Sequence, residues 1–321
     1  MSFLKRTGVW TARAFLLGAA ALAGFHLVTR AQAPLNRGAL GIQDSDAGDC
    51  AVPTLQQYPP GQYNQQRAAN DFLLYAIAAL NVYEDENITR FVVRHFDERW
   101  EQKRSYERNG LHYAVYYKQG DPFEVLVALR GTRLDSLDDL KANFSWFTGG
   151  VLSNEYDLAR SEFQSIRLEA IKAAQGRKIR FVTTGHSLGG GIAYHLAYGF
   201  PCVSAVGFDT SPVWNVFRYD NPFTPISINL HDRLDWLTRI SRLPFPEHDS
   251  NSHRWYPLDL QYSGFKHSIT KFAVGMAGMV TNCQNAKGCK IPLADDSARK
   301  LYCPTYGHQD GLAICEPYIA R

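Results

Sequence analysis

A serine flanked by glycines is the residue in this sequence best suited to do chemistry. It is Ser187, in the Gly-His-Ser-Leu-Gly run of residues 185–189, which follows an apolar stretch and precedes two further glycines. A serine hydroxyl is a poor nucleophile, so it needs a sharp exposed turn, a neighbouring base and N–H groups that stabilise an oxyanion. Small flanking residues permit such a turn between a strand and a helix. We therefore expect Ser187 to be a nucleophile in acyl transfer, with the N–H of Leu188 as one oxyanion donor.

A second motif, the Arg-Gly-Thr run of residues 130–132, follows the apolar residues 127–129. With these two motifs the chain resembles the class 3 lipases, a family of fungal triacylglycerol lipases and bacterial relatives. In that family an Arg-Gly-Ser/Thr turn supplies the second oxyanion donor, so the resemblance assigns this role to Thr132. It also implies an α/β-hydrolase fold, which is a mostly parallel central sheet with helices on both faces.

The resemblance continues at two later strand ends, in residues 208–215 and 228–234. It implies that Asp232 is the acid of a catalytic triad, where it would hold the imidazole in the required tautomer. Asp209 is the alternative acid, because some related lipases carry the acid on the earlier strand and because it replaces a glycine that is usual in the family. Asp235 is expected to be a surface charge.

The base must be a histidine that follows the acid in the chain. Of the four candidates, His267 lies in residues 265–269 just before an expected helix, which resembles the setting of the family's catalytic histidine. His253 is the alternative base, and His248 and His308 are less well placed. A triad of serine, aspartate and histidine requires no metal or organic cofactor.

The expected reaction is hydrolysis of a carboxylic ester, with lipid esters as the expected substrates. The aromatic segment 144–147 lies where the family has a lid, and it would suit transient contact with a lipid interface. An ordinary packed helix explains the same residues equally well. Two other functions remain open: a non-catalytic binding protein with this fold, and the same triad acting on phospholipids, polyesters or thioesters.

The first 33 residues have the pattern of a secretory signal peptide. Basic residues precede an almost continuous apolar run at 14–28, and small residues at 31 and 33 suit a signal peptidase. The run is short for a membrane span, which needs about 20 residues. We expect cleavage and a periplasmic or extracellular protein, with an uncleaved inner-membrane anchor as the alternative.

Charge and cysteine content agree with export. The chain is formally +3, but the first 33 residues hold four basic residues and no acid, so the remainder is −1 and gives no support for nucleic-acid binding. All six cysteines follow the expected cleavage site, and an even number in an exported protein indicates disulfides, with 15 pairings open. No Cys-x-x-Cys pair is present, which makes zinc less suitable as an explanation. The cysteines are Cys50, Cys202, Cys283, Cys289, Cys303 and Cys315.

Hydrophobic periodicity and turn residues predict the elements that must position these side chains. Helices are expected at residues 67–83, 154–174, 189–200 and 266–281. Strands are expected at residues 88–95, 112–117, 123–129, 178–184, 203–208 and 225–230, with a tight turn at 118–122. Alternating strands and helices indicate a parallel sheet, and ligands bind such sheets at the carboxyl ends of the strands. We expect an extended lead-in at 34–62, a hydrolase domain at 63–282 and a cysteine-rich tail at 283–321.

Overall fold

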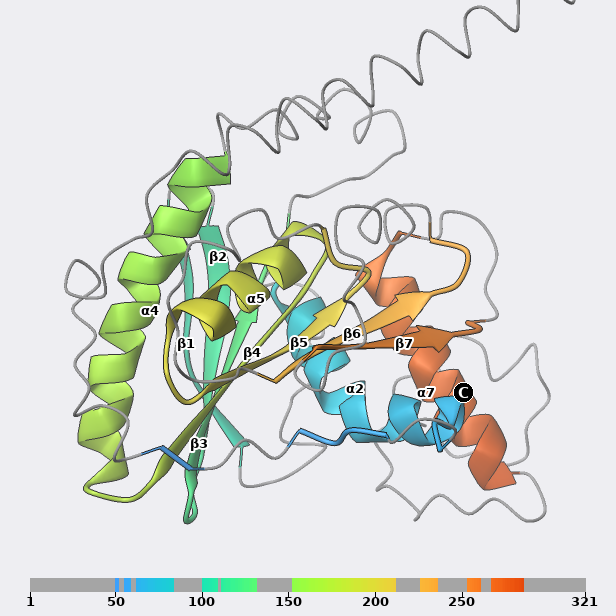
Figure 1. Cartoon of the computed structure of the whole chain (residues 1–321), viewed down its shortest axis with the longest axis horizontal. Helices are drawn as coiled ribbons and strands as arrows, with labels where there is room; N and C mark the ends of the chain where they lie inside the picture. The colour runs from blue at the N-terminus through green and yellow to red at the C-terminus, as the bar shows by residue number, and fades with distance from the viewer. Residues whose placement is uncertain are drawn as a thin grey trace, which may run out of the picture. The chain divides into compact units, whose positions relative to one another are not determined.

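A computed structural model describes most of the expected hydrolase domain (Figure 1). The described residues are 50–51, 55–58, 62–83, 100–108, 111–131, 152–211, 226–235, 253–260 and 267–285. All of them belong to one compact unit, and the second unit, residues 1–43 with 214–220, lies outside them. The predicted signal peptide, the aromatic segment 144–147 and the tail beyond residue 285 also lie outside the described residues. The domain boundaries therefore stay predictions.

The unit is built on a seven-stranded sheet whose spatial order follows the order of the chain. The first two pairings are antiparallel and the remaining four are parallel. The strands are β1 (Trp100–Arg108), β2 (Leu111–Lys118), β3 (Phe123–Leu129), β4 (Ile179–His186), β5 (Val203–Phe208), β6 (Ser227–Asp232) and β7 (His253–Leu258).

The described helices are α2 (Gln65–Asn81), α4 (Leu152–Ala174), α5 (Leu188–Gly199) and α7 (Ile269–Asn285). They cover both faces of the sheet, α4 and α5 on one and α2 and α7 on the other (Figure 1). On the α4 and α5 face, Phe163 packs edge-on against Phe181 of β4 at 5.7 Å between ring centroids. On the α2 and α7 face, Phe208 of β5 meets Phe272 of α7 at 5.4 Å. The mostly parallel α/β architecture predicted from the sequence is confirmed.

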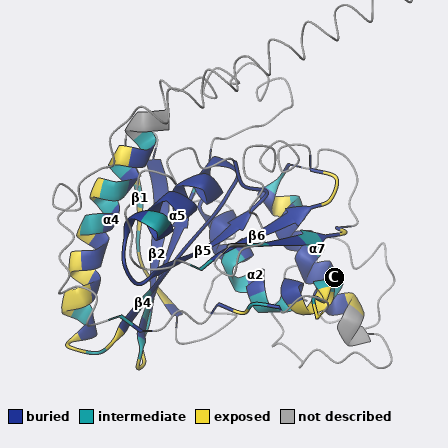
Figure 2. Ribbon diagram, viewed as in Figure 1, coloured by how far each residue is buried: buried dark blue, intermediate teal, exposed yellow. Residues whose placement is uncertain are grey.

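The strands β5 and β6 are buried along their whole length, although β6 alternates polar and apolar residues. Helices cover both faces, so successive side chains are buried whichever face they point to. Every described residue of β5 and β6 is buried, and α5 is buried almost all round, whereas α4 alternates buried and exposed residues (Figure 2). The glycines at the start of α5 let this helix lie close to the sheet, since a Cβ at Gly190 would come within 3.0 Å of the Gly185 carbonyl oxygen.

The predicted elements agree with the structure wherever they are described. All four helices and the strands β2 to β6 lie within a few residues of their predicted bounds. The predicted strand at 88–95 lies outside the described residues. Two strands were missed: β1 is an edge strand with mostly polar, exposed side chains, and β7 follows a polar run that resembled a solvated loop.

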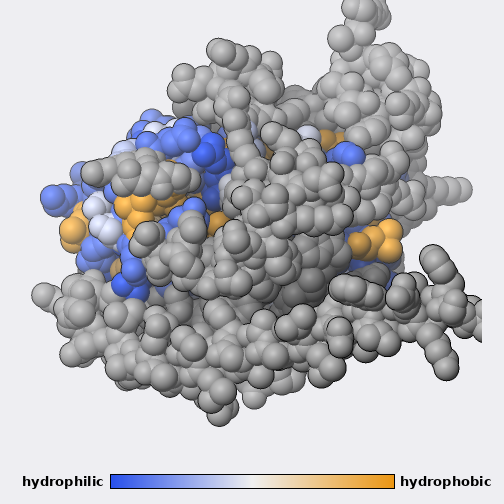
Figure 3. Space-filling view, turned by 90° about the horizontal axis from the view of Figure 1, so that it is seen from above, coloured by the Kyte–Doolittle hydropathy of each residue, from blue (hydrophilic) through white to orange (hydrophobic). Residues whose placement is uncertain are grey.

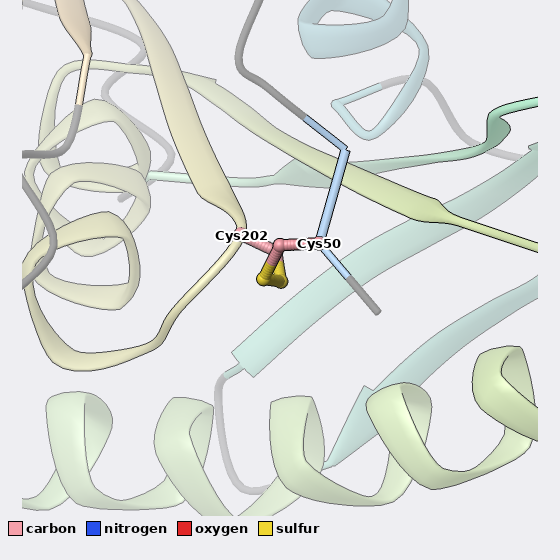
Figure 4. Close-up of a disulfide and its surroundings, with 2 residues drawn as sticks. All are labelled: Cys50 and Cys202. Atoms are coloured by element: carbon pink, nitrogen blue, oxygen red, sulfur yellow. A yellow bond between two sulfur atoms is a disulfide. The ribbon is translucent and has the colours of Figure 1, made fainter. Parts of the chain in front are cut away.

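A disulfide joins Cys50 to Cys202 at the amino end of the parallel strands (Figure 4). The Cα atoms are 5.1 Å apart and the two residues are separated by 152 positions in the chain. The segment that carries Cys50 lies beside the start of β4, because Ala51 N–H donates to the Ile179 carbonyl at 2.9 Å. The expectation of disulfides is confirmed for this pair, and the pairing of the other four cysteines stays a prediction.

None of the described helices is long and apolar enough to cross a bilayer. Seen from above, the described residues that are visible are mostly hydrophilic, with small hydrophobic patches among them (Figure 3).

Candidate active site

Ser187 lies on a sharp turn between β4 and α5. Strand β4 ends at His186 and helix α5 begins at Leu188, and Ser187 between them has φ 56° and ψ −125°. A positive φ in a residue other than glycine is strained, so surrounding contacts must hold it. Ser187 N–H donates to the Phe208 carbonyl at 3.0 Å, and the Ser187 carbonyl accepts from Ser211 N–H at 3.0 Å. The predicted strand–turn–helix context of the serine is present.

Glycines make this turn sterically feasible. A Cβ on Gly189 would lie 2.8 Å from both the carbonyl carbon of Arg130 and the nitrogen of Gly131. A Cβ on Gly185 would lie 2.7 Å from the carbonyl oxygen of Leu129. All of these obstacles are backbone atoms, which cannot rotate aside. The turn therefore packs backbone to backbone against the end of β3.

The two predicted oxyanion donors belong to these two neighbouring segments. Leu188 is the first residue of α5, and the N–H groups of a helix's first turn have no partner within the helix and lie at its positive end. Thr132 lies outside the described residues. The preceding Gly131 is described and lies against the turn, because a Cβ there would be 2.7 Å from the His186 carbonyl oxygen. The described chain after β3 thus lies beside the turn that carries Ser187.

Strand register gathers the remaining candidates at the same edge. His186 is aligned with Phe208 of β5, and Phe208 with Leu230 of β6. Because the strands are parallel, the residues that follow them meet at the carboxyl edge of the sheet. This edge holds Ser187 after β4 and Asp209 after β5.

His267 reaches the same edge from the loop before α7. Its side chain is buried, and its ring packs against the ring of His186 with 4.5 Å between centroids and 37° between planes. Its Nδ1 lies 3.1 Å from Oδ1 of Asp235. Among the described residues no hydrogen bond joins the Ser187 hydroxyl to His267. Such bonds are commonly long without substrate and shorten on binding.

The carboxylate that contacts His267 is not the one favoured from the sequence. Asp235 is fully buried, so the expectation that it is a surface charge is wrong. Asp232 makes no hydrogen bond or ion pair with His267; its Oδ1 accepts from Leu234 N–H at 2.8 Å. Asp232 is the last residue of β6 and is still paired with Leu258 of β7. The strand geometry therefore fixes the direction of the Asp232 side chain. A turn closed by Asp235 N–H and the Asp232 carbonyl, at 3.0 Å, then presents the later aspartate to the histidine.

Asp209 is a third buried carboxylate at this edge. It has a positive φ of 42° and no measurable exposure. Its Oδ1 accepts from the N–H of Asp232 at 2.9 Å, so it holds the end of β6 beside the end of β5. One of its carboxylate oxygens lies within 4.8 Å of a ring nitrogen of His186 and of His267. Asp209 therefore lies close enough to influence the histidines, while its hydrogen bond to Asp232 N–H joins the two strand ends.

One group among the described residues offers three ligand atoms for a metal ion, and it consists of His186, Asp209 and His267. Burial and the neighbouring His267 hold the pKa of His186 well below its usual 6.5, so its imidazole is neutral. The two rings lie against each other at a moderate tilt, which suits ring packing more than convergence of both lone pairs on one ion. The donor set alone does not indicate a metal centre.

The alternative base His253 is not at this edge. It is the first residue of β7 and is aligned with Ser227, the first residue of β6. The length of a six-residue strand, about 17 Å at 3.3 Å per residue, therefore separates it from the edge that carries the other candidates. The strand register therefore favours His267 over His253, and the assignment of the base stays a prediction. His248 and His308 lie outside the described residues.

One residue of the site, Tyr83, was missed by the sequence analysis. Its hydroxyl accepts a hydrogen bond from Gly131 N–H at 2.8 Å and donates to the His186 carbonyl at 3.2 Å. In the sequence it is only the end of the helix predicted at 67–83, and nothing in its neighbourhood signals chemistry. Its role arises from a contact across 103 positions of the chain.

Comparison with known proteins gives a distant likeness. No family model matches the sequence, and no curated protein matches it. Among solved structures the chain is similar to lipase II from Rhizopus niveus, with 13% identity, 55% of this chain and 75% of that chain covered, and a TM-score of 0.40. It is also similar to a lipase from Rhizopus microsporus var. chinensis, with 14% identity, 61% and 78% covered, and a TM-score of 0.41. M37 lipase has 14% identity, 80% and 94% covered, and a TM-score of 0.39.

Lipases are thus found among the solved structures that are similar to this chain. The α/β architecture itself rests on the strand order and layers described above.

Proposed function

We propose that this protein is a serine hydrolase that cleaves carboxylic esters, with Ser187 as nucleophile, His267 as base and Asp235 as acid. The observation that carries the proposal is the buried contact of 3.1 Å between His267 Nδ1 and Asp235 Oδ1, in a histidine whose ring packs on the residue before Ser187. A nucleophile, a base and a group that orients the base are the arrangement that this chemistry requires.

The residues perform the reaction in two halves. Nδ1–H of His267 donates to Asp235, which leaves the lone pair on Nε2 to take the proton of the Ser187 hydroxyl. The serine oxygen attacks the ester carbonyl, and the N–H groups of Leu188 and Thr132 stabilise the oxyanion. The carbon–oxygen bond to the alcohol breaks, the alcohol leaves with the proton from His267, and an acyl-enzyme remains. Water, deprotonated by the same imidazole, hydrolyses the acyl-enzyme and restores the serine.

Lipid esters are the proposed substrates. Leu234, next to the proposed acid, is 60% exposed, and an apolar side chain beside the site suits an acyl chain. Hydrolysis of phospholipids, polyesters and thioesters uses the same triad. These substrates differ only in the groups that the residues around the triad must bind. Export is part of the proposal, since the Cys50–Cys202 disulfide is typical of an oxidising compartment.

Labelling with a fluorophosphonate tests the proposed function. The reagent reacts with an activated serine, so peptide mapping should find the wild-type protein modified at Ser187, and Ser187→Ala should stay unlabelled. Ser165→Ala is the matched control, because its hydroxyl lies on an exposed part of α4 and contacts only the Ser161 carbonyl at 3.4 Å. Absence of label on Ser187 in the folded, oxidised protein would leave a non-catalytic binding protein as the better explanation.

A series of p-nitrophenyl esters then defines the substrate. A steep gain in kcat/KM with long acyl chains at an emulsion interface supports a lipase. A preference for short soluble esters supports an esterase and contradicts the lipid proposal.

A further inference from the structure

Tyr83 connects two backbone segments that are far apart in the chain. It follows helix α2, and its hydroxyl lies between the turn after β3 and the turn after β4. The oxygen accepts from Gly131 N–H at 2.8 Å, and the O–H donates to the His186 carbonyl oxygen at 3.2 Å. One hydroxyl therefore uses its donor and an acceptor position to join two backbone groups.

Both backbone groups lie next to the proposed oxyanion donors. Gly131 precedes Thr132, and the His186 carbonyl belongs to the peptide unit that enters Ser187, one residue before Leu188. The bonds of Tyr83 therefore fix the turn that carries the Leu188 N–H relative to the end of β3. Oxyanion stabilisation is sensitive to the position of this donor, because donors act best at 2.7–3.1 Å from the oxygen.

The surroundings of Tyr83 hold its hydroxyl in one place and one protonation state. Burial raises the pKa of Tyr83 far above its usual 10, so the hydroxyl keeps the proton that it donates. Its ring contacts the His186 ring edge-on at 6.0 Å between centroids, and His186 in turn packs on His267. A Cβ on Gly131 would lie 2.6 Å from the tyrosine oxygen, so only glycine permits this close approach.

We propose that Tyr83 is a positioning residue that holds the Ser187 turn, and with it the Leu188 N–H of the oxyanion hole, against the end of β3 in the position required for ester hydrolysis. The inference rests on the proposed function. Removing the hydroxyl leaves Gly131 N–H and the His186 carbonyl without this bond, which frees the serine turn to move relative to the end of β3. Losing an oxyanion donor outright costs about 100–1000-fold in kcat. Loosening a donor indirectly should cost less, about 10-fold in kcat, with KM changed less than about 2-fold.

The test compares Tyr83→Phe with Tyr198→Phe in the full-length, oxidised protein. Tyr198 is the matched control, because its partly buried hydroxyl is 3.1 Å from Ser227 Oγ at the opposite end of the strands. The readouts are kcat, KM, and the inhibition constants of an alkyl boronic acid and of a carboxylate with the same chain. The boronic acid forms a tetrahedral adduct with the serine and needs the oxyanion hole, whereas the carboxylate does not. Inhibition constants do not depend on the fraction of folded enzyme.

In Tyr83→Phe we expect kcat and the affinity for the boronic acid to fall together, about 10-fold, and the affinity for the carboxylate to stay within about 2-fold. Tyr198→Phe should match the wild type in all of these. The proposal is overturned if Tyr83→Phe retains wild-type kcat, if both inhibitors weaken equally, or if Tyr83→Phe alone fails to fold. A wild-type protein without esterase activity or serine labelling would instead refute the proposed function.

Discussion

The two ends of the parallel strands differ in how they are held. At the carboxyl edge, the buried polar side chains of the proposed site gather, and Ser187 has a strained backbone with a positive φ of 56°. At the amino edge, a disulfide and a backbone hydrogen bond tie the segment of Cys50 to the starts of β4 and β5, although Cys202 also has a positive φ, of 66°. Buried polar groups reduce stability, whereas a cross-link increases it. The comparison indicates that one edge stabilises the fold and the other carries out the chemistry.

The largest effect is expected from Gly189→Ala at the carboxyl edge. The new Cβ would lie 2.8 Å from backbone atoms of Arg130 and Gly131, so the turn must open and the oxyanion donors must separate. We expect fluorophosphonate labelling to fall to background in whatever folded protein is recovered. Gly176→Ala is the control for general destabilisation: a Cβ there meets nothing within 4 Å, but its φ of 80° strains an alanine, so this variant should lose stability and keep the labelling rate per folded molecule. Labelling of Gly189→Ala at the wild-type rate would contradict the packing described for this turn.

At the amino edge, the double variant Cys50→Ser, Cys202→Ser should lose stability and keep activity. In the chain-entropy model, a cross-link over 152 residues stabilises the fold by about 5 kcal/mol, and native disulfides typically contribute about 2–5 kcal/mol. Urea unfolding at pH 7.5 measures this loss. The labelling rate per folded molecule should stay within about 2-fold of the wild type. A large loss of labelling with unchanged stability would contradict the inference that the amino edge stabilises the fold and the carboxyl edge carries out the chemistry.

Titration of His186 should make the carboxyl edge sensitive to acid. Its pKa in the folded protein is held well below 6.5 by burial and by His267, so below pH 6.5 the unfolded chain binds the proton more readily. Stability therefore falls as the pH decreases, by up to about 1.4 kcal/mol per pH unit from this group.

Urea unfolding of the wild type and of His186→Gln at pH 7.5 and pH 5.5 tests this expectation. The variant should lose less stability between the two pH values than the wild type. Equal losses would show that His186 takes up its proton in the folded state as readily as in the unfolded state.

The smallest effect on activity is expected from His253→Ala. This histidine begins β7 at the amino edge, one strand length from the serine. Its removal should change kcat/KM for a p-nitrophenyl ester less than about 2-fold. A loss of 100-fold or more would restore His253 as a base and contradict the placement of the site.

Much of the fold could be predicted from local sequence. The buried strands and amphipathic helices carry clear apolar patterns, and the glycines around Ser187 signal the turn that the structure shows. The edge strand β1 could not be predicted in this way. Its side chains are mostly polar and exposed, because only one neighbour and one partly covered face hold it in the sheet.

The partner of the histidine and the role of Tyr83 depended on contacts that sequence patterns do not encode. Asp232 and Asp235 are three residues apart, and only the turn between them decides which one meets His267. Tyr83 reaches Gly131 across 48 positions of the chain. Both assignments depend on how segments that are far apart in the chain pack together.

Side-by-side substitution of the two aspartates tests the central claim most directly. The measurement is the rate of fluorophosphonate labelling at Ser187 in Asp235→Asn and in Asp232→Asn, with the melting temperature of each variant as a check on folding. If Asp235 orients His267, its amide variant should label about 10⁴-fold more slowly, as expected when a base is held in the wrong tautomer. Asp232→Asn should label within about 10-fold of the wild type. The reverse order of the two rates, or a slow rate in Asp209→Asn alone, would contradict the account.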